Sequence, residues 1–97
     1  MNMARRWYML NENKEPVPTN VMEATKWLGL QVAWAEIGDV KISTIFLGLD
    51  HQLGDGPPLL FETMILGGKH DQDQWRYHTW DEAMEGHKAA VKLVSGS

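Results

Sequence analysis

The sequence contains no cysteine, and this absence removes several kinds of site at once. Without a thiol, the chain cannot form disulfides, use a cysteine nucleophile, or hold zinc or an iron–sulfur cluster through sulfur ligands. Basic residues are also few, with nine Lys and Arg against thirteen Asp and Glu and a formal net charge of −4. Because nucleic-acid affinity comes mainly from clustered Lys and Arg, this balance excludes a generally basic nucleic-acid-binding protein.

Long hydrophobic runs are missing as well, so the sequence predicts no membrane-spanning segment, which needs about 20 consecutive apolar residues. Residues Met1 to Arg6 show no apolar signal core, which favours a cytosolic protein. What is present is a composition of 43% hydrophobic and 23% charged residues over 97 residues. That composition predicts a single globular domain, residues 1–97, large enough for one modest core.

The N-terminal third indicates one strand and one short helix. Trp7 to Leu10 is an aromatic and apolar run typical of a strand, and residues 11–18, with two prolines, predict a loop. Asn20 and Glu23 have the spacing of a capping box, in which each side chain bonds a backbone amide of the first helical turn. Gly29 would end this helix after two to three turns.

A β-hairpin is predicted next, with strands at Gln31 to Ile37 and Val40 to Leu49. The two residues between them, Gly38 and Asp39, put glycine first, which is the signature of a type II′ turn. This register places opposite charges across the ladder by pairing Glu36 with Lys41. The same register pairs Trp34 with Ser43, Ala35 with Ile42, Ala33 with Thr44 and Val32 with Ile45.

The second half of the chain predicts a loop, a strand, a loop and a helix. Residues 50–58 are rich in glycine and proline, which favours a loop, and Leu59 to Leu66 is a strong strand. Residues 67–77 are polar and predict another loop. Thr79 and Glu82 form a second capping box and begin the last helix.

Together these elements predict an α+β fold, with an antiparallel sheet of about four strands in β-α-β-β-β-α order and two helices on one face. Gly86 falls inside the last helix at a cost of about 1 kcal/mol relative to alanine, which a close approach of helix to sheet would explain. The other face of the sheet would be half apolar and uncovered. A second copy of the chain is its simplest cover, so we expect a homodimer.

Asp50 and His51 stand at the end of a predicted strand, where two roles are open. Together with His70 and His78 they would supply metal-ligand atoms, yet no pair has a ligand spacing such as His-Glu-x-x-His. Alternatively, Asp50 and His51 cap and orient the following loop through hydrogen bonds to its backbone. The sequence therefore predicts no metal site and no cofactor.

Two further titratable residues lie at positions predicted to be apolar. Glu62 is in the middle of a strand, and a buried carboxylate is costly unless it is paired. We therefore expect Glu62 to be solvent-accessible or to meet Arg76, Lys69 or a histidine, in a structural pair or in a binding or catalytic role. His87 lies on the core stripe of the last helix and is either a buried neutral histidine or a catalytic base.

Aromatic residues gather around Arg76, just before the last helix. Such residues serve either as core or as the anchors of binding surfaces. Tyr77 and Trp80 fit the core better. Trp75 and Arg76, in a polar segment, are the better surface candidates. One of them, Trp75 or Arg76, would line a cleft with Asp50 and His51 if their loops meet at one end of the sheet.

Three stretches carry a resemblance to a known family: Ile42 to His51 (ISTIFLGLDH), Gly54 to Gly68 (GDGPPLLFETMILGG) and Arg76 to His87 (RYHTWDEAMEGH). They resemble small uncharacterised proteins encoded by bacteriophages and prophages, over residues 31–94. Leu66 stands where that family has an aromatic residue. The resemblance implies a phage or prophage source and expression in the cytoplasm of a bacterial host, and it implies no activity.

We therefore predict a non-enzymatic phage accessory protein that binds a host protein or a small ligand, with counter-defence as one purpose. The expected ligand-binding residues are Asp50, His51, Glu62, Trp75 and Arg76. One alternative is a small metal-assisted hydrolase that uses Asp50, His51, Glu62 and either His78 or His87. A virion or assembly component is the other alternative. Neither nucleic acid nor a membrane is expected as a partner.

Overall fold

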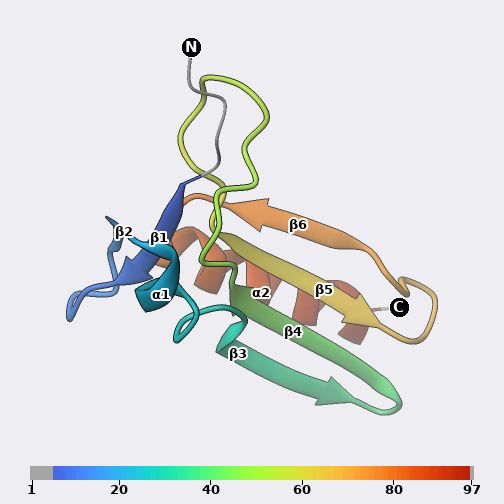
Figure 1. Ribbon diagram of the computed structural model, residues 1–97. Helices are drawn as coiled ribbons and strands as arrows, with labels where there is room; N and C mark the ends of the chain where they lie inside the picture. The colour runs from blue at the N-terminus through green and yellow to red at the C-terminus, as the bar shows by residue number, and fades with distance from the viewer. Residues whose placement is uncertain (1–5, 97) are drawn as a thin grey trace.

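Two antiparallel sheets and one long helix account for most of the computed structural model, which describes residues 6–96 (Figure 1). The four-stranded sheet has the order β3-β4-β5-β6, and the second sheet pairs β1 with β2. The strands are β1 (Trp7–Leu10), β2 (Pro16–Thr19), β3 (Leu30–Ile37), β4 (Val40–Phe46), β5 (Phe61–Leu66) and β6 (Gln74–Tyr77), and the helices are α1 (Val21–Ala24) and α2 (Trp80–Ser95). The predicted α+β class is confirmed.

The small sheet contains a strand where the sequence predicted a loop, because prolines 16 and 18 lie in β2. Proline cannot donate to a ladder, but β2 pairs only with β1 in the described part of the chain, so its outer edge needs no donors. The turn between the two strands is built on Asn11. Its side-chain oxygen accepts from the amides of Asn13 and Glu15, each at 2.9 Å, and Lys14 takes a positive φ of 63°.

The fourth strand of the large sheet is β6, which lies in the segment 67–77 that the sequence predicted to be a loop. In β6 the polar side chains of Gln74 and Arg76 lie on one face of the sheet, and the side chains of Trp75 and Tyr77 lie on the other. Four residues are too few for this alternation to stand out from a polar loop. The strand predicted at residues 7–10 forms as β1, but it belongs to the two-stranded sheet and not to the four-stranded one.

The predicted hairpin forms with the predicted turn. Gly38 has a φ of 59° and Asp39 does not have a positive φ, as a type II′ turn requires, and Glu36 lies opposite Lys41. The pairing of Val32 with Ile45 is wrong, because a bulge between Gln31 and Ala33 makes Gln31 the partner of Ile45. The Gln31 side chain bridges this bulge by donating from Nε2 to the carbonyls of Ala33 (2.7 Å) and Thr44 (2.9 Å).

Both helices begin at the predicted caps. Asn20 accepts from the Glu23 amide at 2.8 Å, and Thr79 accepts from the Glu82 amide at 3.1 Å, while the Glu82 carboxylate accepts from the His78 amide at 2.9 Å. The first helix is shorter than predicted, since regular helix ends at Ala24 and turns continue to Gly29, whose φ is 75°. It contacts β1, whereas α2 packs across all four strands of the large sheet.

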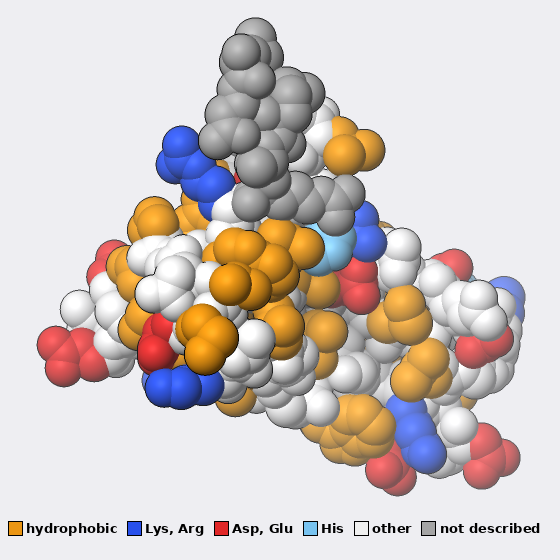
Figure 2. Space-filling model, in the orientation of Figure 1, with side chains coloured by type: hydrophobic (Ala, Val, Ile, Leu, Met, Phe, Trp, Pro, Cys, Tyr) orange, Lys and Arg blue, Asp and Glu red, His pale blue; other side chains and the backbone are white. Residues whose placement is uncertain are grey.

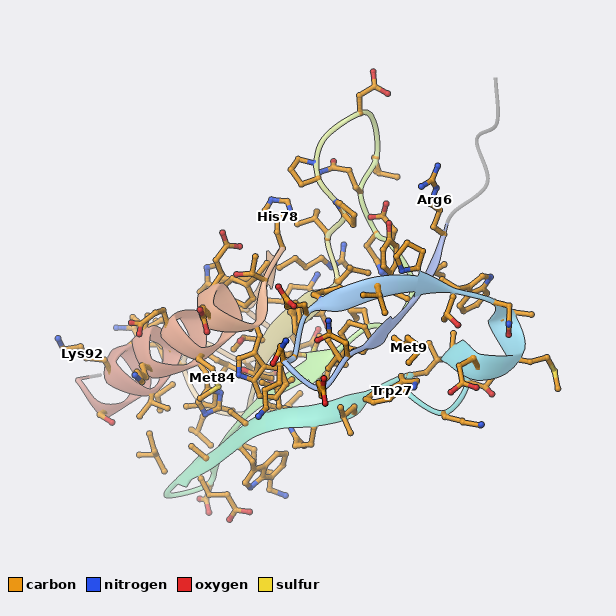
Figure 3. The ribbon with its side chains drawn as sticks, turned by 90° about the vertical axis from the view of Figure 1, so that its left-hand side faces the viewer. Arg6, Met9, Trp27, His78, Met84 and Lys92 are labelled. Atoms are coloured by element: carbon orange, nitrogen blue, oxygen red, sulfur yellow. The ribbon has the colours of Figure 1, made fainter. Side chains whose placement is uncertain are left out.

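Figure 3 shows α2, with Met84 and Lys92, along one side of the four-stranded sheet. The sheet residues on this side are buried and include Ile42, Phe46, Phe61 and Ile65, and α2 buries Ala83 and Ala90 against them. A polar chain crosses this core: Thr63 Oγ1 lies 2.5 Å from Thr44 Oγ1, which lies 2.7 Å from Nδ1 of His87. His87 is therefore a buried, hydrogen-bonded histidine, and burial lowers its pKa.

The opposite face of the large sheet is not covered by any element within residues 6–96. Alternation along the strands puts four apolar side chains on this open face, namely Trp34, Ile45, Met64 and Leu66, together with the charged residues Glu36, Lys41, Glu62 and Arg76. Figure 2, which looks onto this face, shows hydrophobic side chains separated by charged ones. In the described chain, no helix is long and apolar enough to cross a membrane.

Candidate functional site

Asp50 and His51 hold the loop that connects β4 with β5. Asp50 Oδ1 accepts from the backbone amides of Gln52 (2.7 Å) and Leu59 (3.0 Å), so it ties the two ends of the loop together. His51 Nδ1 lies 2.7 Å from the Leu49 carbonyl oxygen. These are the side-chain to backbone hydrogen bonds that the capping interpretation predicts.

Glu62 and Arg76 form a cross-strand ion pair on the open face. The two residues are register partners in β5 and β6, and Arg76 Nε donates to Glu62 Oε2 at 2.9 Å. The Glu62 side chain is 12% exposed and the Arg76 side chain 37%. Arg76 thus supplies the partner that a largely buried carboxylate needs, and the predicted structural pair is confirmed.

Trp75 lies on the other side of the sheet from this ion pair. Its register partner is Thr63, which is fully buried beneath α2, so Trp75 also faces α2. The structure therefore separates Trp75 from Glu62 and Arg76, and these predicted site residues do not share one surface.

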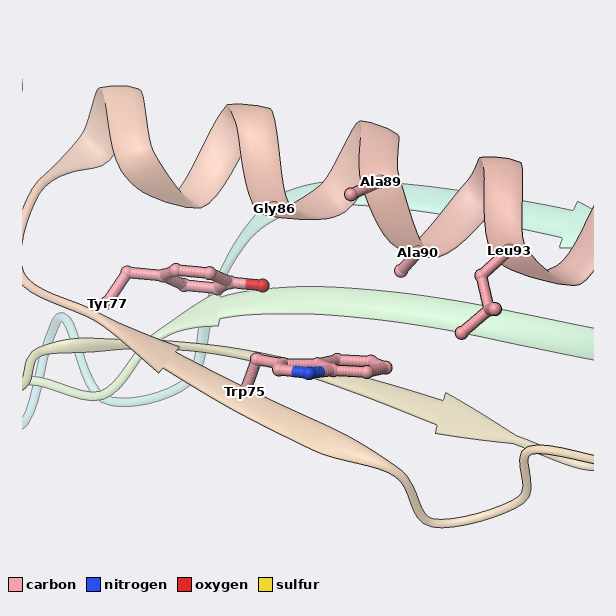
Figure 4. A pocket seen from close by; sticks show the side chains of 6 residues that line it. All are labelled: Trp75, Tyr77, Gly86, Ala89, Ala90 and Leu93. Carbon is pink, nitrogen blue, oxygen red and sulfur yellow. The ribbon is translucent and has the colours of Figure 1, made fainter.

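Trp75 instead lines a groove between the edge strand β6 and α2. The groove has a volume of about 410 Å³ and is formed by Trp75, Tyr77, Gly86, Ala89, Ala90 and Leu93. Figure 4 shows the two aromatic side chains of β6 lying beneath the helix, with Leu93 at the far end. Trp75 and Leu93 are each 39% exposed although both are large and apolar. None of the lining side chains carries a charge at neutral pH.

Gly86 sets how closely α2 approaches β6. A Cβ atom at this position would overlap with Cζ and Oη of Tyr77, so only glycine leaves space for the ring. The close approach that the sequence predicted from a helical glycine is confirmed. Ala89 and Ala90 continue the same flank of the helix with small side chains, which keeps the groove open beyond the Tyr77 ring.

Tyr77 supplies a polar group to the groove. Burial raises the pKa of its hydroxyl, an effect that a hydrogen bond with Thr63 partly opposes, so Tyr77 stays uncharged at neutral pH. From the sequence, Tyr77 was expected in the core, and neither Ala89 nor Leu93 was among the predicted site residues. The available signal was the spacing of Gly86, Ala89, Ala90 and Leu93, which places three small residues and a leucine on one flank of a helix.

The proposed metal ligands have other partners in the structure. His78 Nδ1 lies 2.9 Å from the Pro58 carbonyl oxygen, His87 bonds Thr44 in the core, and Glu62 bonds Arg76. Among residues 6–96, no three His, Asp or Glu side chains are grouped to hold a metal ion. The geometry therefore offers the hydrolase alternative no assembled ligand set in this part of the chain.

The sequence matches no protein-family model, no curated protein and no solved structure at the thresholds of the three comparisons.

Proposed function

We propose that this protein is a phage-borne accessory protein that works by binding, and that its groove receives an apolar group of a host protein or of a small ligand. The observation that carries the proposal is the open groove between β6 and α2, which is lined by the partly exposed Trp75. The interpretation of the motifs in residues 31–94 as resembling phage and prophage proteins is what favours action in the cytoplasm of a bacterial host.

The size and chemistry of the groove favour an uncharged apolar group. Its volume of about 410 Å³ lies within the range of ligand pockets, which runs from about 300 to 1,000 Å³. A charged group would lose its hydration without finding an opposite charge on the lining residues. The Tyr77 hydroxyl offers one hydrogen-bonding position, which would orient a ligand rather than supply most of its affinity.

The exposed surface of Trp75 sets how much binding free energy a ligand gains by covering this side chain. A fully exposed aromatic side chain presents up to about 250 Å², so 39% exposure leaves about 100 Å² to be covered. At about 25 cal/mol per Å², covering Trp75 contributes about 2.5 kcal/mol before the costs of association. Leu93 adds about 1 kcal/mol in the same way. A micromolar Kd corresponds to about 8 kcal/mol, so a ligand of that affinity must gain most of its binding free energy from contacts with the rest of the lining.

The uncharged fluorophore N-phenyl-1-naphthylamine tests the groove directly. We expect saturable binding to the wild-type protein, seen as a rise in probe fluorescence. Ala89→Leu should weaken this binding at least tenfold, because leucine fills the groove while retaining high helix propensity. Lys88→Leu, which adds the same side chain at an exposed position outside the groove, is the matched control and should bind as the wild type does. Equal binding by Ala89→Leu and the wild type would refute the groove as the site.

The counter-defence purpose needs a biological measurement. We expect expression of the wild-type protein in a bacterial host to raise the plating efficiency of a phage that the host's defences restrict. Ala89→Leu should lose this effect and Lys88→Leu should keep it. If Ala89→Leu protects as well as the wild type, the effect does not depend on the groove.

A further inference from the structure

β6 forms one edge of the four-stranded sheet. Within residues 6–96, β6 pairs only with β5. The Ile65 amide donates to the Asp73 carbonyl at 3.0 Å, so positions 73, 75 and 77 direct their backbone groups toward β5. By the alternation of an antiparallel ladder, Gln74 and Arg76 direct theirs outward, where another strand can pair with them.

The groove lies directly beside this edge, on the side of α2. Trp75 belongs to β6 and Leu93 to α2, and both are 39% exposed. An unpaired backbone edge and an adjoining apolar surface therefore form one continuous region. A partner that adds a strand to β6 would also cover Trp75.

We propose that this partner is a second copy of the chain, which pairs antiparallel through β6 around a two-fold axis at Trp75. The two four-stranded sheets then form one sheet of eight strands, with both α2 helices on the same face and antiparallel to each other. The two grooves join into a single trough whose floor is the paired β6 strands. The assignment of the trough as a ligand site rests on the function proposed above, whereas the dimer does not.

Two features make β6 complementary to itself in this register. Gln74 lies opposite the partner's Arg76, so an amide oxygen meets a guanidinium donor and no like charges meet within the strand. Trp75 lies opposite the partner's Trp75, so the two rings form an aromatic pair at the floor of the trough.

The charges on α2 also fit an antiparallel arrangement. Acidic residues occupy its first turn, Asp81 and Glu82, and Lys92 lies in its last turn. Reversal by the two-fold axis brings the acidic end of one helix toward the lysine end of the other. The other free edge of the sheet, β3, fits a partner strand less well because its pairing is interrupted by the bulge between Gln31 and Ala33.

Sedimentation velocity on the full chain tests the dimer. We expect a mass twice the 11.1 kDa of one chain for the wild type. Trp75→Lys and Trp75→Glu should each weaken dimerisation at least 100-fold, because like charges then face each other at the axis. An equimolar mixture of these two variants should recover the dimer as a heterodimer. Trp34→Lys, which alters an exposed tryptophan on the open face, should remain dimeric.

A wild type that stays monomeric at millimolar concentration would overturn the inference and would leave β6 to a strand from another protein. Dissociation by Trp34→Lys, with Trp75→Lys still dimeric, would overturn it in favour of the open face. Circular dichroism spectra identical to wild type confirm that each variant is folded. Probe binding by a monomeric wild type would leave the proposed function intact, and a dimer that binds no probe would leave the dimer intact but remove its ligand role.

Discussion

Replacing Gly86 by alanine has two effects of opposite sign on stability: a gain in helix propensity and a steric overlap with Tyr77. On helix propensity alone, this change stabilises a helix interior by about 1 kcal/mol. The structure predicts the opposite sign, because the new Cβ would overlap with the end of the Tyr77 ring. The ring can only relieve this overlap by moving away from the helix.

The cost of that movement follows from what holds Tyr77. The ring packs against the core cluster of Phe46 and Phe61, and its hydroxyl bonds Thr63. Loss of the hydrogen bond costs about 1 kcal/mol, and forced repacking costs about 1–3 kcal/mol. After the gain of about 1 kcal/mol in helix propensity, we expect a net destabilisation of about 1–3 kcal/mol, or roughly 5–15 °C in Tm.

Urea unfolding of four proteins checks this reasoning: the wild type, Gly86→Ala, Tyr77→Leu and the double variant. In the Tyr77→Leu background, the end of the ring is absent, so Gly86→Ala should stabilise by about 1 kcal/mol. The sign of the alanine effect therefore depends on the residue at 77. If Gly86→Ala stabilises the protein that retains Tyr77, the close approach of helix and strand does not exist as described.

Three further predictions concern the polar interactions. Because burial lowers the folded-state pKa of His87, the unfolded chain binds more protons below about pH 6.5, so the free energy of unfolding should fall between pH 7.5 and 5.5. Urea unfolding of His87→Gln should show a weaker fall across that range, and an unchanged pH dependence would contradict the assignment. Thr44→Val should cost about 1–3 kcal/mol in the same assay, because it leaves Thr63 and His87 without their shared partner. Glu62→Gln should cost less than about 1 kcal/mol, since Arg76 is partly exposed, and a larger loss would indicate a role beyond this ion pair.

Local signals explain why the hairpin was predictable. The turn at Gly38 and the charge pair Glu36–Lys41 lie within a few residues of each other, so the chain specifies the register without help from distant segments. The bulge is different, because it depends on the Gln31 side chain reaching the carbonyl of Thr44 across the ladder. That contact has no local sequence pattern, and the pairing predicted for Val32 failed there.

The candidate site was predictable only in part, because it depends on contacts between distant segments. The pairing of Glu62 with Arg76 could be anticipated, since a carboxylate in a buried strand requires a partner. The groove joins Trp75 to Leu93 across the packing of α2 on the sheet, which no local pattern specifies. Of the local sequence features, only Gly86 indicated the groove, because a glycine in a helix interior implies a close neighbour.

The alternation of β6 decides which residues are available for binding. Arg76 is turned to the open face and pairs with Glu62. The Tyr77 hydroxyl bonds Thr63 and, since a hydroxyl can make more than one hydrogen bond, keeps a position for a ligand in the groove. The Trp75 ring lies on the α2 side of the sheet and remains 39% exposed, so part of its apolar surface is available to a partner. A shift of β6 by one residue would turn Trp75 to the open face and Arg76 into the groove, which would bury a charge among apolar side chains. The cost of burying the Arg76 charge therefore favours the register that presents Trp75 to the groove.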